Sequence, residues 1–186
     1  MHFFIKMKKR IEHKIEIPEG VEIKLEDSFL IAKGPKGENR KKINLRGLIF
    51  EIEDNKIKIG HDKATKNEKK RINTLISHIH NMINGVQEKF EYKMKICASH
   101  FPMNVNVNNN EILIKNFLGE KIARKAKIPI NAEVKIQGQE ITILSTDKEI
   151  AGQTAANIEK ATKIIGRDRR IFQDGIYIIS KGGKKI

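Results

Sequence analysis

Three arginines stand within four residues near the C-terminal end of this 186-residue chain, in the run Arg167-Asp168-Arg169-Arg170. A guanidinium group is planar and permanently charged, and it donates paired hydrogen bonds that match the oxygens of a phosphate group. The run follows Gly166, a residue type that closes helices, and the carbonyls of a last helical turn favour nearby cations. Donors that the helix end does not use need other acceptors. We therefore expect the three arginines to bind the phosphates of a nucleic acid.

Other basic residues are expected to add to this contact. The stretch 181–185 is predicted to be a flexible basic tail that helps to position the second half of the chain on RNA. The basic clusters 40–46 and 121–127 are expected to add diffuse attraction. The expected RNA-binding residues outside the arginine run are Lys163, Lys181, Lys184, Lys185, Lys121, Arg124 and Lys125.

The same region also holds two carboxylates, Asp168 and Asp174. A nuclease uses such side chains to hold magnesium, so a magnesium-dependent RNA-processing enzyme is the alternative hypothesis. The simpler interpretation makes Asp168 an ion-pair partner of the arginines and Asp174, which precedes a glycine, a turn residue. No spacing of residues here is specific for catalysis.

The remaining reactive side chains give no catalytic, cofactor or metal site. His78 and His80 lie two residues apart on a predicted helix, so they point in different directions and make a poor ligand pair. Cys97 and His100 resemble a nucleophile and a base, but no third group to orient them is evident, and a structural thiol is favoured. The run Gly34–Gly37 lacks the signature of a phosphate loop and predicts a tight turn.

A helix must position the arginine run. Thr146 begins a Thr-x-x-Glu capping box, so the helix should start near Asp147. Apolar or small residues recur at steps of three and four between Ile150 and Ile165, which predicts one buried stripe. The helix should end at Gly166.

The sequence predicts this arrangement twice. A second capping box begins at Thr65 and its helix should end at Gly85, the same twenty-residue distance. The segments Ile17–Leu25 and Ile128–Ile136 precede the two helices and are similar to each other, which favours an internal repeat. Alternating apolar residues predict strands near 10–17, 21–25, 29–33, 48–53, 56–60, 90–96, 103–107, 112–116, 133–137, 140–144 and 172–180.

These patterns predict an α+β protein of two tandem related domains, 1–86 and 87–186. Each should be an antiparallel β-sheet with one α-helix packed on one face. Residues 1–86 hold 19 basic and 12 acidic side chains, and residues 87–186 hold 18 and 11. The excess charge is therefore spread over both halves, and is not confined to a basic tail.

The composition excludes several classes of protein. The net charge of +14 points to a polyanionic partner. The single cysteine cannot form an intrachain disulfide and fits a reducing compartment. No apolar run reaches the length of a bilayer span, and Met1–Lys6 is too short to be a signal peptide, with Met7 as an alternative start. Few aromatic residues are present, so folded RNA read through its backbone fits better than stacked single strands.

Two runs near the C-terminal end carry a family resemblance. Gly152–Glu159, together with Arg167–Tyr177, closely resembles the C-terminal signature of the universal ribosomal large-subunit protein L6 family, in its archaeal and eukaryotic form. The resemblance covers the chain from Met7 to Lys181. Shorter matching pieces are Ile17–Val21, Gly34–Gly37, Ser99–Pro102 and Asn116–Lys121.

The resemblance implies a structural protein of the large ribosomal subunit and not an enzyme. Members of this family have two homologous α+β domains and bind large-subunit ribosomal RNA near the base of the lateral stalk, close to the sarcin–ricin loop. The second domain makes the main RNA contacts, and Arg167, Arg169 and Arg170 match the basic motif of the family. The implied partners are ribosomal RNA and neighbouring large-subunit and stalk-base ribosomal proteins in the cytoplasmic ribosome, with no membrane, cofactor or small-molecule substrate. A basic adaptor for an acidic protein stays open as a third hypothesis.

Overall fold

The computed structural model describes residues 9–53, 55–168 and 170–186. Some of the expectations above concern residues outside these ranges. They are the short N-terminal run Met1–Lys6, the alternative start at Met7, and Arg169.

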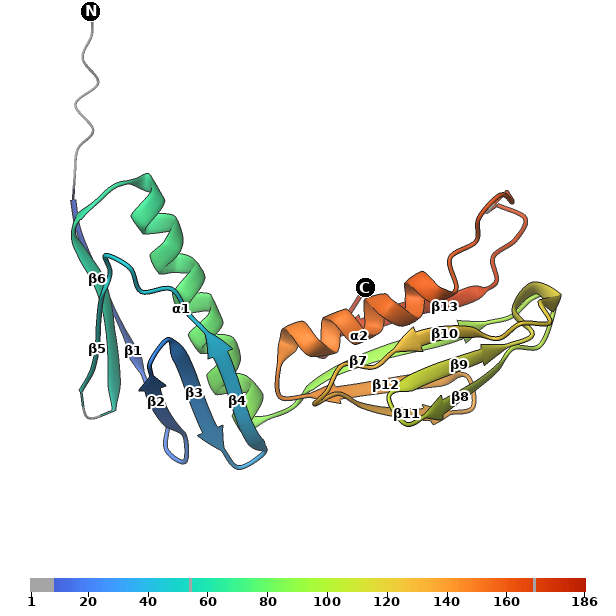
Figure 1. The fold of residues 1–186 in the computed structure, drawn as a ribbon, viewed down its shortest axis with the longest axis horizontal. Helices are drawn as coiled ribbons and strands as arrows, with labels where there is room; N and C mark the ends of the chain where they lie inside the picture. Colours follow the sequence, from blue (N-terminus) through green and yellow to red (C-terminus); the bar gives the residue numbers. More distant parts are fainter. Residues whose placement is uncertain (1–8, 54, 169) are drawn as a thin grey trace, which may run out of the picture. The chain divides into compact units, whose positions relative to one another are not determined.

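The chain divides into two compact units, the first ending at Glu88 and the second beginning at Lys89. Each unit combines antiparallel strands with one long α-helix (Figure 1). The predicted α+β class, with two related domains, is therefore confirmed. Within the described residues, no helix has the length and apolar character needed to cross a membrane.

The first unit contains six strands and one helix. They are β1 (Lys9–Glu16), β2 (Glu22–Glu26), β3 (Phe29–Gly34), β4 (Gly37–Lys42), β5 (Ile49–Glu53), β6 (Lys56–Ala64) and α1 (Lys66–Gln87). The strands form two antiparallel sheets, in the orders β1-β6-β5 and β2-β3-β4. The unit therefore has two small sheets where the sequence pattern predicted one.

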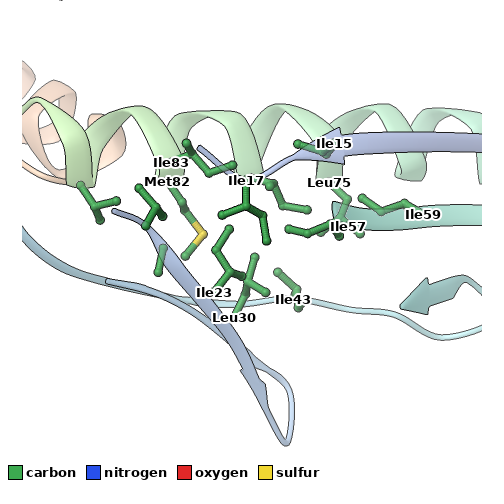
Figure 2. Packing of buried hydrophobic residues seen from close by; sticks show 14 of the residues in the cluster. Ile15, Ile17, Ile23, Leu30, Ile43, Ile57, Ile59, Leu75, Met82 and Ile83 are labelled. Atoms are coloured by element: carbon green, nitrogen blue, oxygen red, sulfur yellow. The ribbon is translucent and has the colours of Figure 1, made fainter. Parts of the chain in front are cut away.

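One helix holds both sheets of the first unit together. Leu75 and Met82 of α1 point from the helix toward the strands, where they meet Ile57 of β6 and Ile23 and Leu30 of β2 and β3 (Figure 2). Ile57 and Leu30 are fully buried. Each such side chain stabilises the fold by about 1.5–3 kcal/mol, so the apolar face of α1 is the main connection between the sheets.

The second unit repeats this plan and adds to it. Its elements are β7 (Phe90–Cys97), β8 (Asn104–Asn108), β9 (Glu111–Lys115), a 3-10 turn (Phe117–Gly119), β10 (Arg124–Lys127), β11 (Glu133–Gln137), β12 (Glu140–Ser145), α2 (Lys148–Ala161), β13 (Gly175–Lys181) and β14 (Lys184–Lys185). The sheets have the orders β11-β12-β7-β13-β14 and β10-β9-β8. α2 packs on both sheets, through β7, β12 and β13 of the larger and β10 of the smaller.

The topology confirms the internal repeat. In each unit a first strand (β1 or β7) is followed by a three-stranded sheet (β2–β4 or β8–β10) and then by a hairpin (β5–β6 or β11–β12). The second strand of the hairpin pairs antiparallel with the first strand of the unit, and the helix follows. Strands β13 and β14 are additions on the other side of β7.

One part of the sequence evidence for the repeat was wrong. The first Ile-Pro segment leads into β2, whereas the second leads into β11, so the two segments occupy different places in the repeat. They share only a local turn, in which Val21 and Ala132 donate to the carbonyls of Pro18 and Pro129, both at 3.3 Å. Proline fixes one dihedral of such a turn, so similar local sequences arise without a common place in the fold.

The first helix begins as predicted and ends later. The Thr65 backbone N–H donates to Glu68 Oε2 at 2.8 Å, and the Asn67 N–H donates to Thr65 Oγ1 at 3.3 Å, which completes the capping box. The helix continues two residues past Gly85 because Val86 is fully buried in the core. The predicted end at Gly85 was therefore wrong, since burial of the next residue outweighed the glycine signal.

The second helix is shorter than predicted. The capping side chain belongs to Asp147 rather than Thr146, because the Glu149 N–H donates to Asp147 Oδ1 at 2.8 Å. The helix ends before Thr162, not at Gly166, and Ile165 of the predicted buried stripe is 81% exposed. The arginine run therefore lies in a loop beyond the helix.

The hydroxyl of Thr162 explains where α2 ends. Its Oγ1 donates to the Glu159 carbonyl at 3.2 Å and accepts a hydrogen bond from the Ile176 N–H at 3.0 Å. The side chain is buried, so both contacts are shielded from water. This hydroxyl ties the last turn of α2 to β13, and the chain leaves the helix there.

Candidate nucleic-acid interface

The loop of residues 163–174 joins α2 to β13 and carries the arginine run (Figure 1). The guanidinium carbon of Arg167 lies 4.9 Å from the ring centroid of Phe172. A cation over an aromatic face is held in place while its N–H groups still point outward at the ring edge. Arg167 and Arg170 are both exposed, whereas the predicted role of Arg169 concerns a residue outside the described ranges.

Asp168 is the ion-pair partner that the sequence predicted. Its Oδ2 lies 3.0 Å from a terminal nitrogen of Arg170, and its Oδ1 accepts from the Arg170 backbone N–H at 2.9 Å. The side-chain hydrogen bond from Arg170, followed by the backbone one, lowers the pKa of Asp168. The Arg170 side chain is nevertheless 91% exposed, so most of its surface faces solvent.

Asp174 anchors the end of this loop. Its side chain is only 1% exposed, and Oδ1 accepts hydrogen bonds from the backbone N–H groups of Ser99 and His100 at 2.5 and 3.0 Å. The His100 ring nitrogen Nδ1 lies 2.5 Å from the other oxygen. Asp174 was predicted to be a turn residue, and it also connects the segment after β7 to the start of β13.

The negative charge of Asp174 determines which ring nitrogen of His100 carries a proton. Burial alone would raise the pKa of Asp174, but the hydrogen bonds from His100 and Ser99 together lower it. The carboxylate is thus ionised at neutral pH and accepts from a protonated Nδ1. The His100 ring stacks on Phe172 with centroids 4.9 Å apart, so contacts run from Asp174 through His100 and Phe172 to Arg167.

Arg124 belongs to a different arrangement from the one predicted. Its guanidinium donates to both carboxylate oxygens of Glu120 at 2.8 and 2.6 Å, and also to the carbonyls of Ala161 and Lys163. It also lies 4.2 Å from the ring centroid of Phe117. Arg124 thus supplies the cation at the C-terminal end of α2 that the sequence analysis assigned to the arginine run.

A groove lies along the C-terminal half of α2 and reaches β13. It has a volume of 550 Å³, and Lys160, Lys163 and Tyr177 line it together with one acidic residue, Glu159. Lys163, Lys121 and Lys125 are exposed, although Lys125 lies 3.7 Å from a carboxylate oxygen of Glu111. The groove therefore combines positive charge with a partly apolar surface next to the arginine loop.

The predicted flexible tail is a hairpin. Strand β14 pairs antiparallel with β13, so that Lys181 faces Lys184 and Ser180 faces Lys185. The intervening Gly182 donates to the Glu91 carbonyl at 2.9 Å, and its φ of 55° suits a glycine. The three lysines are exposed on this hairpin, and the prediction of flexibility was wrong because backbone pairing holds the segment.

The two aspartates of the magnesium hypothesis are already occupied by donors. Asp168 accepts from Arg170, and Asp174 from Ser99 and His100. No three metal-ligating side chains gather anywhere in the part of the chain that the structure describes. His100 is oriented by Asp174, a partner that the sequence analysis did not find, and its ring packs against Phe172.

Comparison with known proteins identifies the family. The sequence model of Ribosomal protein L6 matches residues 17–89 and 101–175, one match in each unit. The chain belongs to the ribosomal protein L6 family. The large ribosomal subunit protein uL6 of Archaeoglobus fulgidus is 47% identical over 175 residues, which cover 91% of this chain and 89% of that protein.

Two further relatives place the chain in the archaeal branch of the L6 family. The large ribosomal subunit protein uL6 of Methanobrevibacter smithii is 48% identical over 172 residues, covering 92% of this chain and 96% of that protein. The protein of the same name from Methanococcus vannielii is 44% identical over 174 residues, covering 94% and 96%. The family resemblance is therefore confirmed, and membership in a family of ribosomal proteins decides against an enzyme.

The structure brings together some predicted residues of this L6 family member and separates others. Arg167 and Arg170 share one loop with Lys163, whereas the guanidinium of Arg124 is turned to internal acceptors. Sequence reasoning missed the contact between His100 and Asp174. Both residues lie in segments that carry the family resemblance, but nothing in a single sequence pairs two positions 74 residues apart.

Proposed function

We propose that this chain is a structural constituent of the large ribosomal subunit that binds large-subunit ribosomal RNA. By the family resemblance, its site lies near the base of the lateral stalk and the sarcin–ricin loop. Its partners are then that RNA and neighbouring large-subunit and stalk-base ribosomal proteins, in the cytoplasmic ribosome. The second domain makes the main RNA contacts in this proposal.

The observation that carries the proposal is that the loop of residues 163–174 is held in place by contacts beneath its arginines. Arg167 lies over Phe172, whose ring stacks on His100, and His100 is held by the buried Asp174. A guanidinium group fixed in this way loses little side-chain freedom when it binds a phosphate. The exposed Arg170 lies in the same loop, and the net charge of +14 attracts RNA from solution.

The proposed contact surface consists of the loop, Lys163 in the α2 groove, the exposed lysines before and within β10, and the β13–β14 hairpin. We assign Arg124 a supporting role because its guanidinium already donates to Glu120 and to two carbonyls. The residues that we propose to contact RNA are Arg167, Arg169, Arg170, Lys163, Lys121, Lys125, Lys181, Lys184 and Lys185.

The experiment compares two double variants of the full chain. Arg167→Ala/Arg170→Ala removes two charges from the loop, whereas Lys135→Ala/Lys148→Ala removes two exposed charges from β11 and from the start of α2. The start of α2 lies about 20 Å from its end, given 1.5 Å per residue. Affinity for transcribed large-subunit ribosomal RNA is measured at several salt concentrations.

We expect the loop variant to bind more weakly and to lose about 0.7–0.9 units of log–log salt slope per phosphate contact. The control variant should keep a slope close to that of the unchanged chain. Equal slopes for the two variants would exclude the loop as a phosphate contact. If an acidic protein from the large subunit displaced the RNA and bound through Arg167, the adaptor hypothesis would replace this proposal.

A further inference from the structure

A second basic groove lies in the first unit, between α1 and the segment that follows β4. Its volume is 280 Å³. Lys41, Lys42, Lys70 and Arg71 line it, and no described lining residue is acidic. The buried Leu75 contributes to its apolar floor. Positive walls above an apolar floor favour a ligand with both charge and carbon surface.

The groove is built by the side chain of Arg71. Its terminal nitrogen Nη2 donates to the carbonyls of Asn44 and Arg46 at 3.3 and 2.8 Å. These bonds hold the β4–β5 connection against the helix. The groove is therefore formed before a ligand arrives, which lowers the entropy lost on binding.

The placement of positive charge on α1 is unfavourable for the helix itself. Four of its first six residues are basic, namely Lys66, Lys69, Lys70 and Arg71, and Glu68 is the only acidic residue of the first turn. The N-terminal end of a helix carries a partial positive charge, so cations there are repelled. An external anion in the groove would offset this repulsion.

Two of the lysines in the groove lack a carboxylate partner. Lys24, Lys33 and Lys56, on the strands of the same unit, each lie within 4.0 Å of a glutamate oxygen. By contrast, Lys42 and Lys70 are exposed, and neither forms an ion pair with a carboxylate in the described part of the chain. Their charge is available to a partner.

We propose that this groove is a second RNA-binding site, which takes the sugar-phosphate backbone of folded ribosomal RNA. Phosphates face Lys42 and Lys70, and the carbon face of a ribose covers the apolar floor at Leu75. The inference rests on the proposed function for its ligand. It adds a contact in the first unit, so that both halves of the chain hold RNA and each raises the effective concentration for the other.

The test uses a groove variant and a control of equal charge. Lys42→Gln/Lys70→Gln removes two positive charges from the groove and leaves the bracing residue Arg71 in place. Lys14→Gln/Lys36→Gln removes two exposed charges that lie outside the groove in the same unit. Affinity of the full chain for transcribed large-subunit ribosomal RNA is measured against salt, with Arg167→Ala/Arg170→Ala in parallel.

We expect the groove variant to lose about 1.5 units of log–log slope, for two contacts of 0.7–0.9 each, and the control to keep its slope. An unchanged slope in the groove variant, alongside a reduced slope in the Arg167→Ala/Arg170→Ala variant, overturns the second site alone. If the unchanged chain does not bind this RNA, both proposals fail. Binding of poly-glutamate that depends on Lys42 and Lys70, with RNA binding unaffected, would make the groove a protein-docking surface and overturn the RNA assignment.

A second measurement does not depend on the folding of any variant. Exposed lysines of the unchanged chain are acetylated with and without the RNA, and the products are quantified by mass spectrometry. Lys42 and Lys70 should be protected in the complex, while Lys14 and Lys36 stay reactive. Equal protection of all four lysines would contradict a specific site.

Discussion

Asp174 is the residue whose removal should most disturb the second unit. Its buried carboxylate accepts hydrogen bonds from two backbone N–H groups and from the His100 ring. Substitution by alanine removes the acceptor of three donors, and a buried donor left unsatisfied costs about 1–3 kcal/mol. Because Ser99 and His100 are exposed and water can reach their donors, we expect Asp174→Ala to lower the free energy of unfolding by about 2–4 kcal/mol.

Asp174→Asn should have a smaller effect, since its amide oxygen can still accept from Ser99 or His100. We expect this variant to lower the free energy of unfolding by about 1–2 kcal/mol, because a neutral hydrogen bond replaces a charge-assisted one and one contact is weakened. The chain contains no tryptophan, so urea unfolding is followed by far-ultraviolet circular dichroism. Hydrogen exchange then assigns the change to one unit, because two units can unfold separately.

The matched control is Asp168→Ala, which removes an aspartate of the same loop whose side chain is 43% exposed. Solvent screens an exposed ion pair, so this variant should stay close to the unchanged chain. If Asp174→Ala also stayed within about 0.5 kcal/mol of the unchanged chain, the role assigned to Asp174 would be refuted.

Three further predictions concern stability, each measured by urea unfolding. Thr65→Ala should destabilise the first unit by about 1 kcal/mol through loss of the helix cap, and Thr65→Ser should restore it. Gly34→Ala should destabilise the same unit by about 1–3 kcal/mol, because a Cβ there would lie 2.8 Å from Cγ2 and the carbonyl oxygen of Val86; a neutral effect would contradict the close approach. The pKa of Asp174 is lower in the folded chain than its ordinary value of 3.8, so the ionised carboxylate stabilises the fold above pH 3.8. This contribution is lost as the pH falls through the pKa of the folded state. The decline in the free energy of unfolding below pH 3.8 should therefore be shallower in Asp174→Asn.

The sequence predicted those elements whose signals are local. The capping box at Thr65 sets the start of α1, and alternating apolar residues located most strands, because each signal depends on neighbours within one turn or one strand. Strand β4 was missed because Asn39 is its only buried side chain. It is held instead by pairing with β3 and by Arg40 over Phe29 at 4.1 Å, and neither contact leaves a periodic pattern.

The candidate site was predictable only in part, for the same physical reason. The arginine run was evident from residue type, and the pairing of Asp168 with Arg170 followed from proximity. The anchor formed by Asp174 and His100 depends on tertiary contact between separate segments, and so does the internal use of Arg124. A charge count cannot tell a guanidinium that faces solvent from one that braces the fold.

The central claim is that the loop of residues 163–174 presents guanidinium groups to ribosomal RNA. A structure of the large ribosomal subunit that contains this chain tests it most directly. We predict a guanidinium nitrogen of Arg167 or Arg170 at about 2.7–2.9 Å from a phosphate oxygen. The claim is contradicted if both side chains face protein carboxylates or solvent, with no phosphate within ion-pair distance of the loop.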